Sequence, residues 1–95
     1  MKIIITQDGA TLVADNIVEV RTLFIDISDN TLHDFVDDET DFDSIEFAVA
    51  VFTVNDNMTV LGIYATEEER NYAKYKLDMY LYDSQSNKFE MPERK

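Results

Sequence analysis

The sequence predicts an α+β fold: an antiparallel four-stranded sheet with one long C-terminal helix packed on a face and a short acidic helix inserted between strands. Three observations predict it. Runs of β-branched and aromatic residues, typical of strands, recur through the first two thirds of the chain. A capping pattern opens a long helical segment in the last third. The strand-like runs are interrupted by "HDFVDDETDFDSIEF", residues 33–47, where seven of fifteen residues are carboxylates and none is Lys or Arg.

The composition indicates one domain, residues 1–95, with an acidic insertion at about 29–46 and a flexible tail at about 86–95. Hydrophobic residues make up 45% of the chain, which is too large a share for a disordered protein. The absence of Cys excludes disulfides and thiolate metal sites. No apolar run reaches the roughly eighteen residues that cross a bilayer, and the opening residues turn polar too early for a signal peptide. We therefore expect a cytoplasmic protein.

The charge is strongly negative and unevenly distributed. Twenty acidic and eight basic residues give a formal net charge of -12, and no Lys or Arg lies between Arg21 and Arg70. Such a field repels phosphate, so we expect no direct binding to nucleic acid or to a membrane. It would attract a basic groove, although solubility alone also accounts for an acidic composition.

The first strand signals lie in the N-terminal third. "KIIITQ" is a short β-branched run, and the "DGA" that follows is a turn signal in which Gly9 can take a positive φ. Ile17 to Ile27 is expected to form one long strand with a solvent-facing side, and "ADN" before it is a bulge or turn.

The acidic insertion is expected to begin as a short helix in "SDNTLHDFVDD". Asn30 or Thr31 can cap it, and Leu32, Phe35 and Val36 have helical spacing. "IEFAVAVFTVND" then forms a second long strand, and its nearly continuous apolar run indicates a central, doubly covered position. "MTVLGIYA" returns after a turn to make an antiparallel hairpin.

The final helix opens at a capping box formed by Thr66 and Glu69 and extends to about Asp83. At 100° per residue two apolar stripes emerge. The stripe expected to face the sheet consists of Ala73, Leu77, Tyr80 and Leu81. The second stripe consists of Tyr72, Tyr75, Met79 and Tyr82. This second stripe either packs in the core of a curled sheet or forms a contact surface for a second copy or a partner.

The sequence gives little support for a catalytic site or a metal site. His33 is the one histidine and there are only two glycines, so no phosphate loop or nucleophile constellation can be argued, and we expect no enzymatic activity. A calcium loop ending at Glu46 would need Gly at its sixth position, where Thr40 stands. We predict no cofactor and no specific metal site. Loose binding of a divalent cation stays open for Asp37, Asp38, Asp41 and Asp43.

The acidic insertion carries the functional hypothesis. Its apolar residues, Phe35, Val36, Phe42 and Ile45, would tether a ridge of carboxylates to the core. A ridge ordered before binding loses less entropy on association and would fit a groove built for phosphates. A solvated acidic loop is the alternative. The carboxylates of the ridge are Asp34, Asp37, Asp38, Glu39, Asp41, Asp43 and Glu46.

Three segments, "IIITQDG", "VLGIYATEEERNYAKYKLDMYL" and "KFEMPERK", resemble a family of small proteins from phages and mobile elements of Gram-positive bacteria. These proteins have a "TQDG"-like hairpin and a "LG-x-Y-x-TEEE" junction between strand and helix. They end with an aromatic residue near "MP". The resemblance covers roughly half the chain and concerns mostly architecture, with Gly62 and Tyr64 shaping the last strand. The acidic middle, 29–46, is an insertion that the pattern lacks.

Small, acidic, cysteine-free phage proteins with an added element are similar, as a class, to the anti-CRISPR inhibitors of type II systems. By that analogy we expect an acidic inhibitor that mimics DNA and occupies the basic cleft of a nucleic-acid-processing protein, most concretely Cas9, in the host cytoplasm. The residues expected to bind are the seven carboxylates of the ridge, with Tyr72, Tyr75 and Tyr82 as a second patch. The alternative is a module that self-associates, as a homodimer, through the tyrosine stripe.

Overall fold

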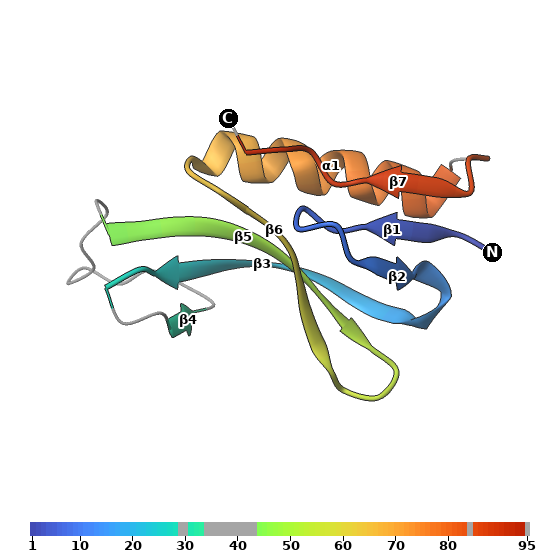
Figure 1. The fold of residues 1–95 in the computed structure, drawn as a ribbon, viewed down its shortest axis with the longest axis horizontal. Coiled ribbons are helices and arrows are strands. Elements are labelled where there is room, and N and C mark those ends of the chain that lie inside the picture. The colour runs from blue at the N-terminus through green and yellow to red at the C-terminus, as the bar shows by residue number, and fades with distance from the viewer. Residues whose placement is uncertain (29–30, 34–43, 84, 95) are drawn as a thin grey trace.

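In the described residues, two sheets and one α-helix build the fold (Figure 1). The computed structural model describes residues 1–28, 31–33, 44–83 and 85–94. In chain order the elements are β1 (Ile3–Ile5), β2 (Thr11–Val13), the 3-10 turn η1 (Ala14–Asn16), β3 (Ile17–Asp26), β4 (Thr31–His33), β5 (Ile45–Thr53), β6 (Met58–Tyr64), α1 (Glu67–Asp83) and β7 (Lys88–Glu90).

The larger sheet has four antiparallel strands in the order β4-β3-β5-β6, and α1 packs on it. This confirms the predicted fold class. It also confirms β5 as the central strand, because residues 48–51 are fully buried. The β5–β6 hairpin closes through a turn in which Asp56 takes a positive φ of 62°. The long strand predicted from Ile17 is β3, and "ADN" is the 3-10 turn before it.

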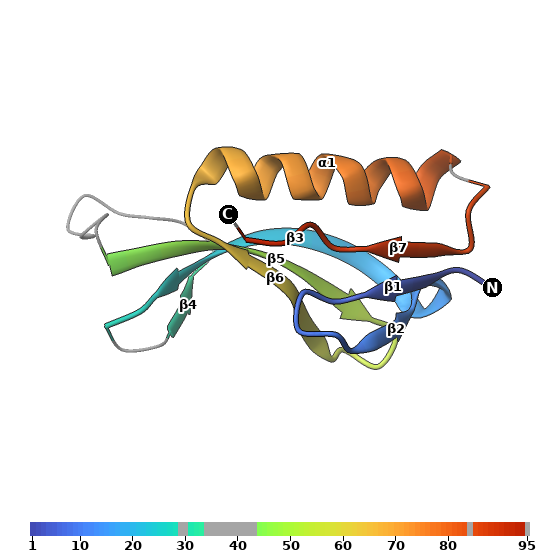
Figure 2. The same ribbon diagram turned by 45° about the horizontal axis from the view of Figure 1, so that its top comes forward.

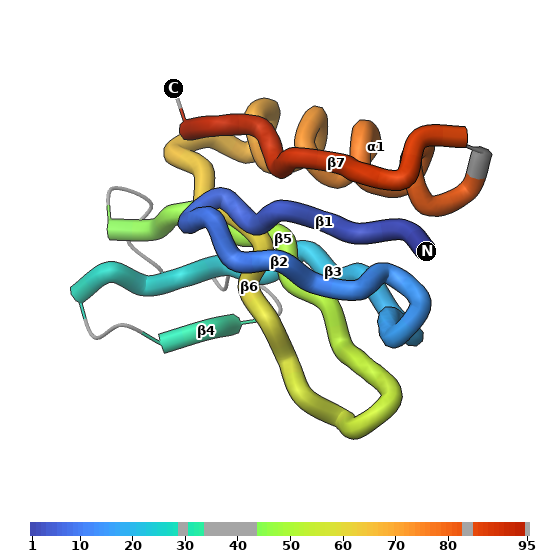
Figure 3. The backbone as a smooth tube through the Cα atoms, turned by 45° about the vertical axis from the view of Figure 1, so that its right-hand side comes forward, coloured from blue at the N-terminus to red at the C-terminus, as the bar shows by residue number. Residues whose placement is uncertain are grey.

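A second, three-stranded sheet has the order β2-β1-β7 and lies beside the first (Figure 3). Here β1 pairs antiparallel with β2 through the turn at Gly9, whose φ is +94°, and parallel with β7. The sequence reasoning placed the first strand in the four-stranded sheet. Instead, the short strand β4 occupies the edge of that sheet.

β4 also corrects the prediction of a helix beginning at Asn30 or Thr31. Thr31, Leu32 and His33 pair with Asp26, Ile25 and Phe24 of β3 and are extended. The edge of β3 offers unpaired backbone groups, and pairing with them satisfies hydrogen bonds that a short exposed helix would leave to water. The remainder of the predicted helix, including Phe35 and Val36, lies outside the described residues.

The main core lies between the four-stranded sheet, α1 and the three-stranded sheet. Ala73, Leu77 and Tyr80 are buried and Leu81 is partly buried, as expected for the stripe that faces the sheet. A smaller cluster on the opposite face of the large sheet consists of Leu23, Ile25, Ala48 and Ala50.

The C-terminal segment, expected to be a flexible tail, forms β7 and packs on the core. Phe89 stacks on Tyr80 with 5.3 Å between ring centroids. Met91 is only 5% exposed, and its N–H donates to the carbonyl of Ile5 at 2.9 Å. The difference arises because β1 has a free edge that β7 fills, a pairing between the two ends of the chain that local composition does not reveal.

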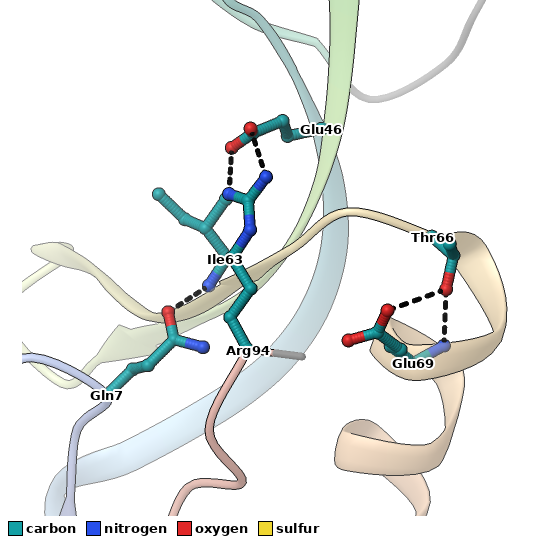
Figure 4. A network of polar contacts seen from close by, with 6 residues as sticks. All are labelled: Gln7, Glu46, Ile63, Thr66, Glu69 and Arg94. Atoms are coloured by element: carbon teal, nitrogen blue, oxygen red, sulfur yellow. Dashed lines mark hydrogen bonds and ion pairs between the residues drawn. The ribbon is translucent and has the colours of Figure 1, made fainter.

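Gln7 joins the small sheet to β6 (Figure 4). Its N–H donates to the carbonyl of Leu61, and its side-chain oxygen accepts from the N–H of Ile63, both at 2.8 Å. These two bonds flank Gly62, where the β5–β6 register shifts. The hydroxyl of Tyr64 donates to the carbonyl of Pro92 at 2.8 Å. The segments "TQDG", "LGIYATEEE" and "EMPE" therefore meet at one junction.

We predict that Gly62→Ala lowers the free energy of unfolding by about 1–2 kcal/mol, because a small residue is required where the Tyr64 ring folds back over the strand. A Cβ at Gly62 would lie 2.8 Å from the Tyr64 hydroxyl oxygen. Urea denaturation measures the change. The control is the same substitution in a Tyr64→Phe background, where the missing hydroxyl reduces the penalty. Equal stability of Gly62→Ala and the parent protein would contradict the close approach.

Candidate partner-binding surface

Six of the seven ridge carboxylates, Asp34, Asp37, Asp38, Glu39, Asp41 and Asp43, lie outside the described residues. Their segment, 34–43, connects β4 to β5, which lie on opposite sides of β3. His33 ends β4, and the carbonyl of Ser44 accepts a hydrogen bond from the N–H of Ile27 at 2.8 Å. Both ends of the segment are thus attached to the same end of the large sheet. Of the four predicted tethers, Ile45 is described and is buried.

Glu46, the seventh ridge carboxylate, is engaged within the molecule. Arg94 donates to the two carboxylate oxygens of Glu46 at 2.6 and 2.7 Å, and this ion pair holds the C-terminal segment against β5 (Figure 4). These hydrogen bonds hold the pKa of the Glu46 carboxyl below its usual value. Because Arg94 compensates its charge, Glu46 offers less to a cationic partner than the sequence suggested.

The same end of the molecule carries the start of α1 (Figure 2). The capping box is confirmed, since the Glu69 N–H donates to the Thr66 hydroxyl oxygen at 3.2 Å and that hydroxyl donates to the Glu69 carboxylate at 3.3 Å. Glu67 and Glu68 complete a first turn of three carboxylates, which the positive end of the helix dipole stabilises.

A groove of about 240 Å³ lies between this first turn and the C-terminal segment. Its lining residues are Tyr64, Glu68, Glu69, Tyr72, Pro92 and Glu93. The Tyr64–Pro92 hydrogen bond holds the two sides together. Burial, and to a lesser degree the negative charge of Glu69, raises the pKa of Tyr64 to about 12. The groove therefore combines carboxylates with aromatic rings.

The groove was not predicted from the sequence. The segment "TEEE" was interpreted only as the start of a helix and "MPERK" only as a tail. The acidic residues at both places were visible signals. Their proximity depends on the parallel pairing of β1 with β7, which brings Pro92 and Glu93 back to the beginning of α1.

Most basic side chains of the described residues are already engaged. Lys74, Lys88 and Arg94 pair with Asp78, Glu90 and Glu46, and Arg21 pairs with Glu19. Lys2 donates to the carbonyl of Tyr80. Within the described ranges no cation forms an ion pair with Glu68 or Glu93. Among the described residues, these two carboxylates of the groove are thus left without an ion pair.

Arg70 is a buried cation between α1 and the large sheet. It is 5% exposed, and its guanidinium carbon lies 5.3 and 5.4 Å from the ring centroids of Phe24 and Phe47. Its Nε donates to the Asn71 side chain, whereas its Nη1 has no hydrogen-bond partner among the described residues. Burial lowers the pKa of Arg70. Cation–π contacts thus hold the start of α1 against β3 and β5.

The second stripe of α1 faces solvent, so of the two alternatives for it, packing in the core of a curled sheet is wrong. Tyr72, Tyr75, Met79 and Tyr82 are 56%, 59%, 50% and 94% exposed. Lys76 Nζ lies 5.6 Å from the centroid of the Tyr72 ring. The stripe is available as a contact surface.

In the part of the chain that the structure describes, no three His, Asp or Glu side chains gather to hold a metal ion. No helix there combines the length and apolarity that a bilayer-crossing helix requires. Comparisons with protein-family models, with curated proteins and with solved structures found no match for this chain.

Proposed function

We propose that this protein is an acidic inhibitor that binds the basic DNA-binding cleft of a nucleic-acid-processing protein and blocks the entry of DNA. The supporting observation is an acidic groove at one end of the molecule, the end at which residues 33 and 44 also lie. Segment 34–43, with six carboxylates, joins the sheet at the end where the acidic groove lies, and Glu68 and Glu93 have no cationic partner among the described residues.

The mechanism is competition for a cationic surface. A cleft built for phosphates holds Lys and Arg side chains, which attract carboxylates and guide rapid association. Duplex DNA presents one charge per about 1.7 Å of axis, a density that a folded surface does not reach. The described groove carboxylates Glu68 and Glu93 are held by α1 and by the C-terminal segment before binding, so they lose less entropy on association. Binding should weaken steeply as salt concentration rises.

The proposed target is Cas9. Its motif-reading site uses arginines against the edges of guanines, so a cluster of carboxylates can engage the same groups. The three segments that resemble phage and mobile-element proteins of Gram-positive bacteria add support, since such elements are exposed to type II CRISPR systems.

The test is reversal of charge in the acidic segment. Asp37→Lys, Asp38→Lys and Asp41→Lys together should raise the concentration needed to inhibit DNA cleavage by Cas9–guide RNA at least tenfold, because three charges change sign at the contact and the net charge changes by six units. The melting curve should move little. The matched control reverses Asp15, Glu19 and Asp56, exposed carboxylates distributed over η1, β3 and the β5–β6 turn, with the same change in net charge. Unchanged inhibition by the first triple variant would refute the proposal.

A second candidate is self-association through the tyrosine stripe, which the exposure of Tyr72, Tyr75 and Tyr82 favours. Light scattering would then show a dimer that persists at high salt and dissociates in the Tyr75→Ala, Tyr82→Ala variant. A monomer at high protein concentration would eliminate this candidate.

A further inference from the structure

The exposed face of α1 has the spacing of a coiled-coil seam. Glu68, Tyr72, Tyr75, Met79 and Tyr82 follow one another at intervals of four, three, four and three residues. This is the alternation that keeps a stripe facing a partner helix along its length. The opposite face of α1 is occupied, because Ala73 and Leu77 are fully buried against the sheets. Figure 2 shows α1 along one side of the molecule, and the exposure of Tyr72, Tyr75, Met79 and Tyr82 places the seam on the solvent side of this helix.

The seam and the acidic groove are continuous. Glu68 and Tyr72 belong to both, so the stripe begins at a carboxylate and continues into aromatic and thioether side chains. The groove, at about 240 Å³, is smaller than typical small-molecule pockets and is suited to a single long side chain. Tyr72 already has a cation near its ring, since Lys76 Nζ lies 5.6 Å from the centroid.

Charge favours a basic partner over a second copy of this chain as the molecule that binds this face. A second copy would bring together two chains with a net charge of -12 each, with Glu68 and Glu93 in the groove near the contact. Like charges at an interface are repulsive, whereas Arg or Lys opposite Glu68 and Glu93 would compensate them. Tyr and Met are residues enriched in interfaces and able to adapt to an apolar helix face.

We infer that this face binds an amphipathic, basic helix of a partner protein. Apolar side chains of that helix lie on Tyr72, Tyr75, Met79 and Tyr82, and an Arg or Lys enters the groove between Glu68 and Glu93. Binding of this helix does not use segment 34–43, so the surface functions as a second contact whether or not the proposed inhibition of Cas9 holds.

The experiment uses the full chain and a fluorescent synthetic helix of about three heptads, with Leu at the seam positions and Arg and Lys elsewhere. Fluorescence anisotropy should show saturable binding. Two control peptides separate the contributions: one carries Glu in place of Arg and Lys, and one has the basic composition with the seam scrambled. Both should bind at least tenfold more weakly.

Protein variants locate the contact. Glu68→Gln with Glu93→Gln, and separately Tyr75→Ala with Tyr82→Ala, should each weaken binding of the basic helix at least tenfold. Val54→Ala, an exposed apolar residue in the β5–β6 turn, and Asp15→Asn should leave it unchanged. Equal binding of the scrambled peptide, or insensitivity to both double variants, would overturn the inference. So would a stable dimer in which this face is buried between two copies.

Discussion

Replacing Met91 with Ala is expected to lower the free energy of unfolding by about 2–4 kcal/mol, the usual cost of removing a buried Met or Leu side chain and leaving a cavity. Met91 is 5% exposed and belongs to the main core together with Ile4, Tyr64 and Tyr80. Its backbone N–H also extends the parallel pairing of β7 with β1 by donating to Ile5. The side chain therefore anchors the C-terminal segment that forms one wall of the groove.

Urea denaturation followed by circular dichroism measures this effect. Met79→Ala is the matched control, because the same side chain is removed from a half-exposed position on α1 and the change there should stay within about 0.5 kcal/mol. A loss below about 1 kcal/mol for Met91→Ala would mean that the segment does not pack as the structure describes.

The second large effect is alkaline destabilisation through Tyr64. Its pKa is raised to about 12 from an ordinary value of 10.0, because burial disfavours the phenolate and Glu69 adds negative charge nearby. The folded protein therefore holds this proton more tightly than the unfolded chain does. The stabilisation is fully present below pH 10 and is lost as the pH rises toward about 12. Two pH units correspond to about 2–3 kcal/mol.

Denaturation of the parent protein and of Tyr64→Phe across this pH range isolates the effect. Lys residues and the other tyrosines are common to both proteins, so the difference between the curves reports Tyr64. The stability of the parent should fall more steeply than that of the variant between pH 10 and 12. Parallel curves would show that Tyr64 is accessible to solvent and hydroxide in the folded state.

Elements defined by local sequence were predictable. The Thr66–Glu69 capping box predicted the start of α1, and the continuous apolar run after Ile45 predicted a central strand. Both signals arise from residues close in the chain, since capping depends on neighbouring side chains and burial on hydrophobic patterning. The buried stripe that contains Ala73 and Leu77 followed from helical periodicity for the same reason.

Features that depend on contacts between distant residues were not predictable. β7 forms because β1 presents a free edge, and Gln7 bonds to β6 across more than fifty residues of chain. The residues from Thr31 were predicted to begin a helix, but they form a strand because they pair with β3. Composition located the acidic segment but not the groove, since Glu68 and Glu93 line the same groove only because β7 pairs with β1.

Inhibition by this protein requires that its carboxylates and DNA compete for the same cationic cleft. The direct measurement is the affinity of the protein for the Cas9–guide RNA complex, determined with increasing concentrations of a duplex that carries the recognition motif. Competition predicts that the apparent Kd for the protein rises in proportion to duplex concentration and that no ternary complex forms. An unchanged Kd, with protein and duplex bound together, would contradict the claim.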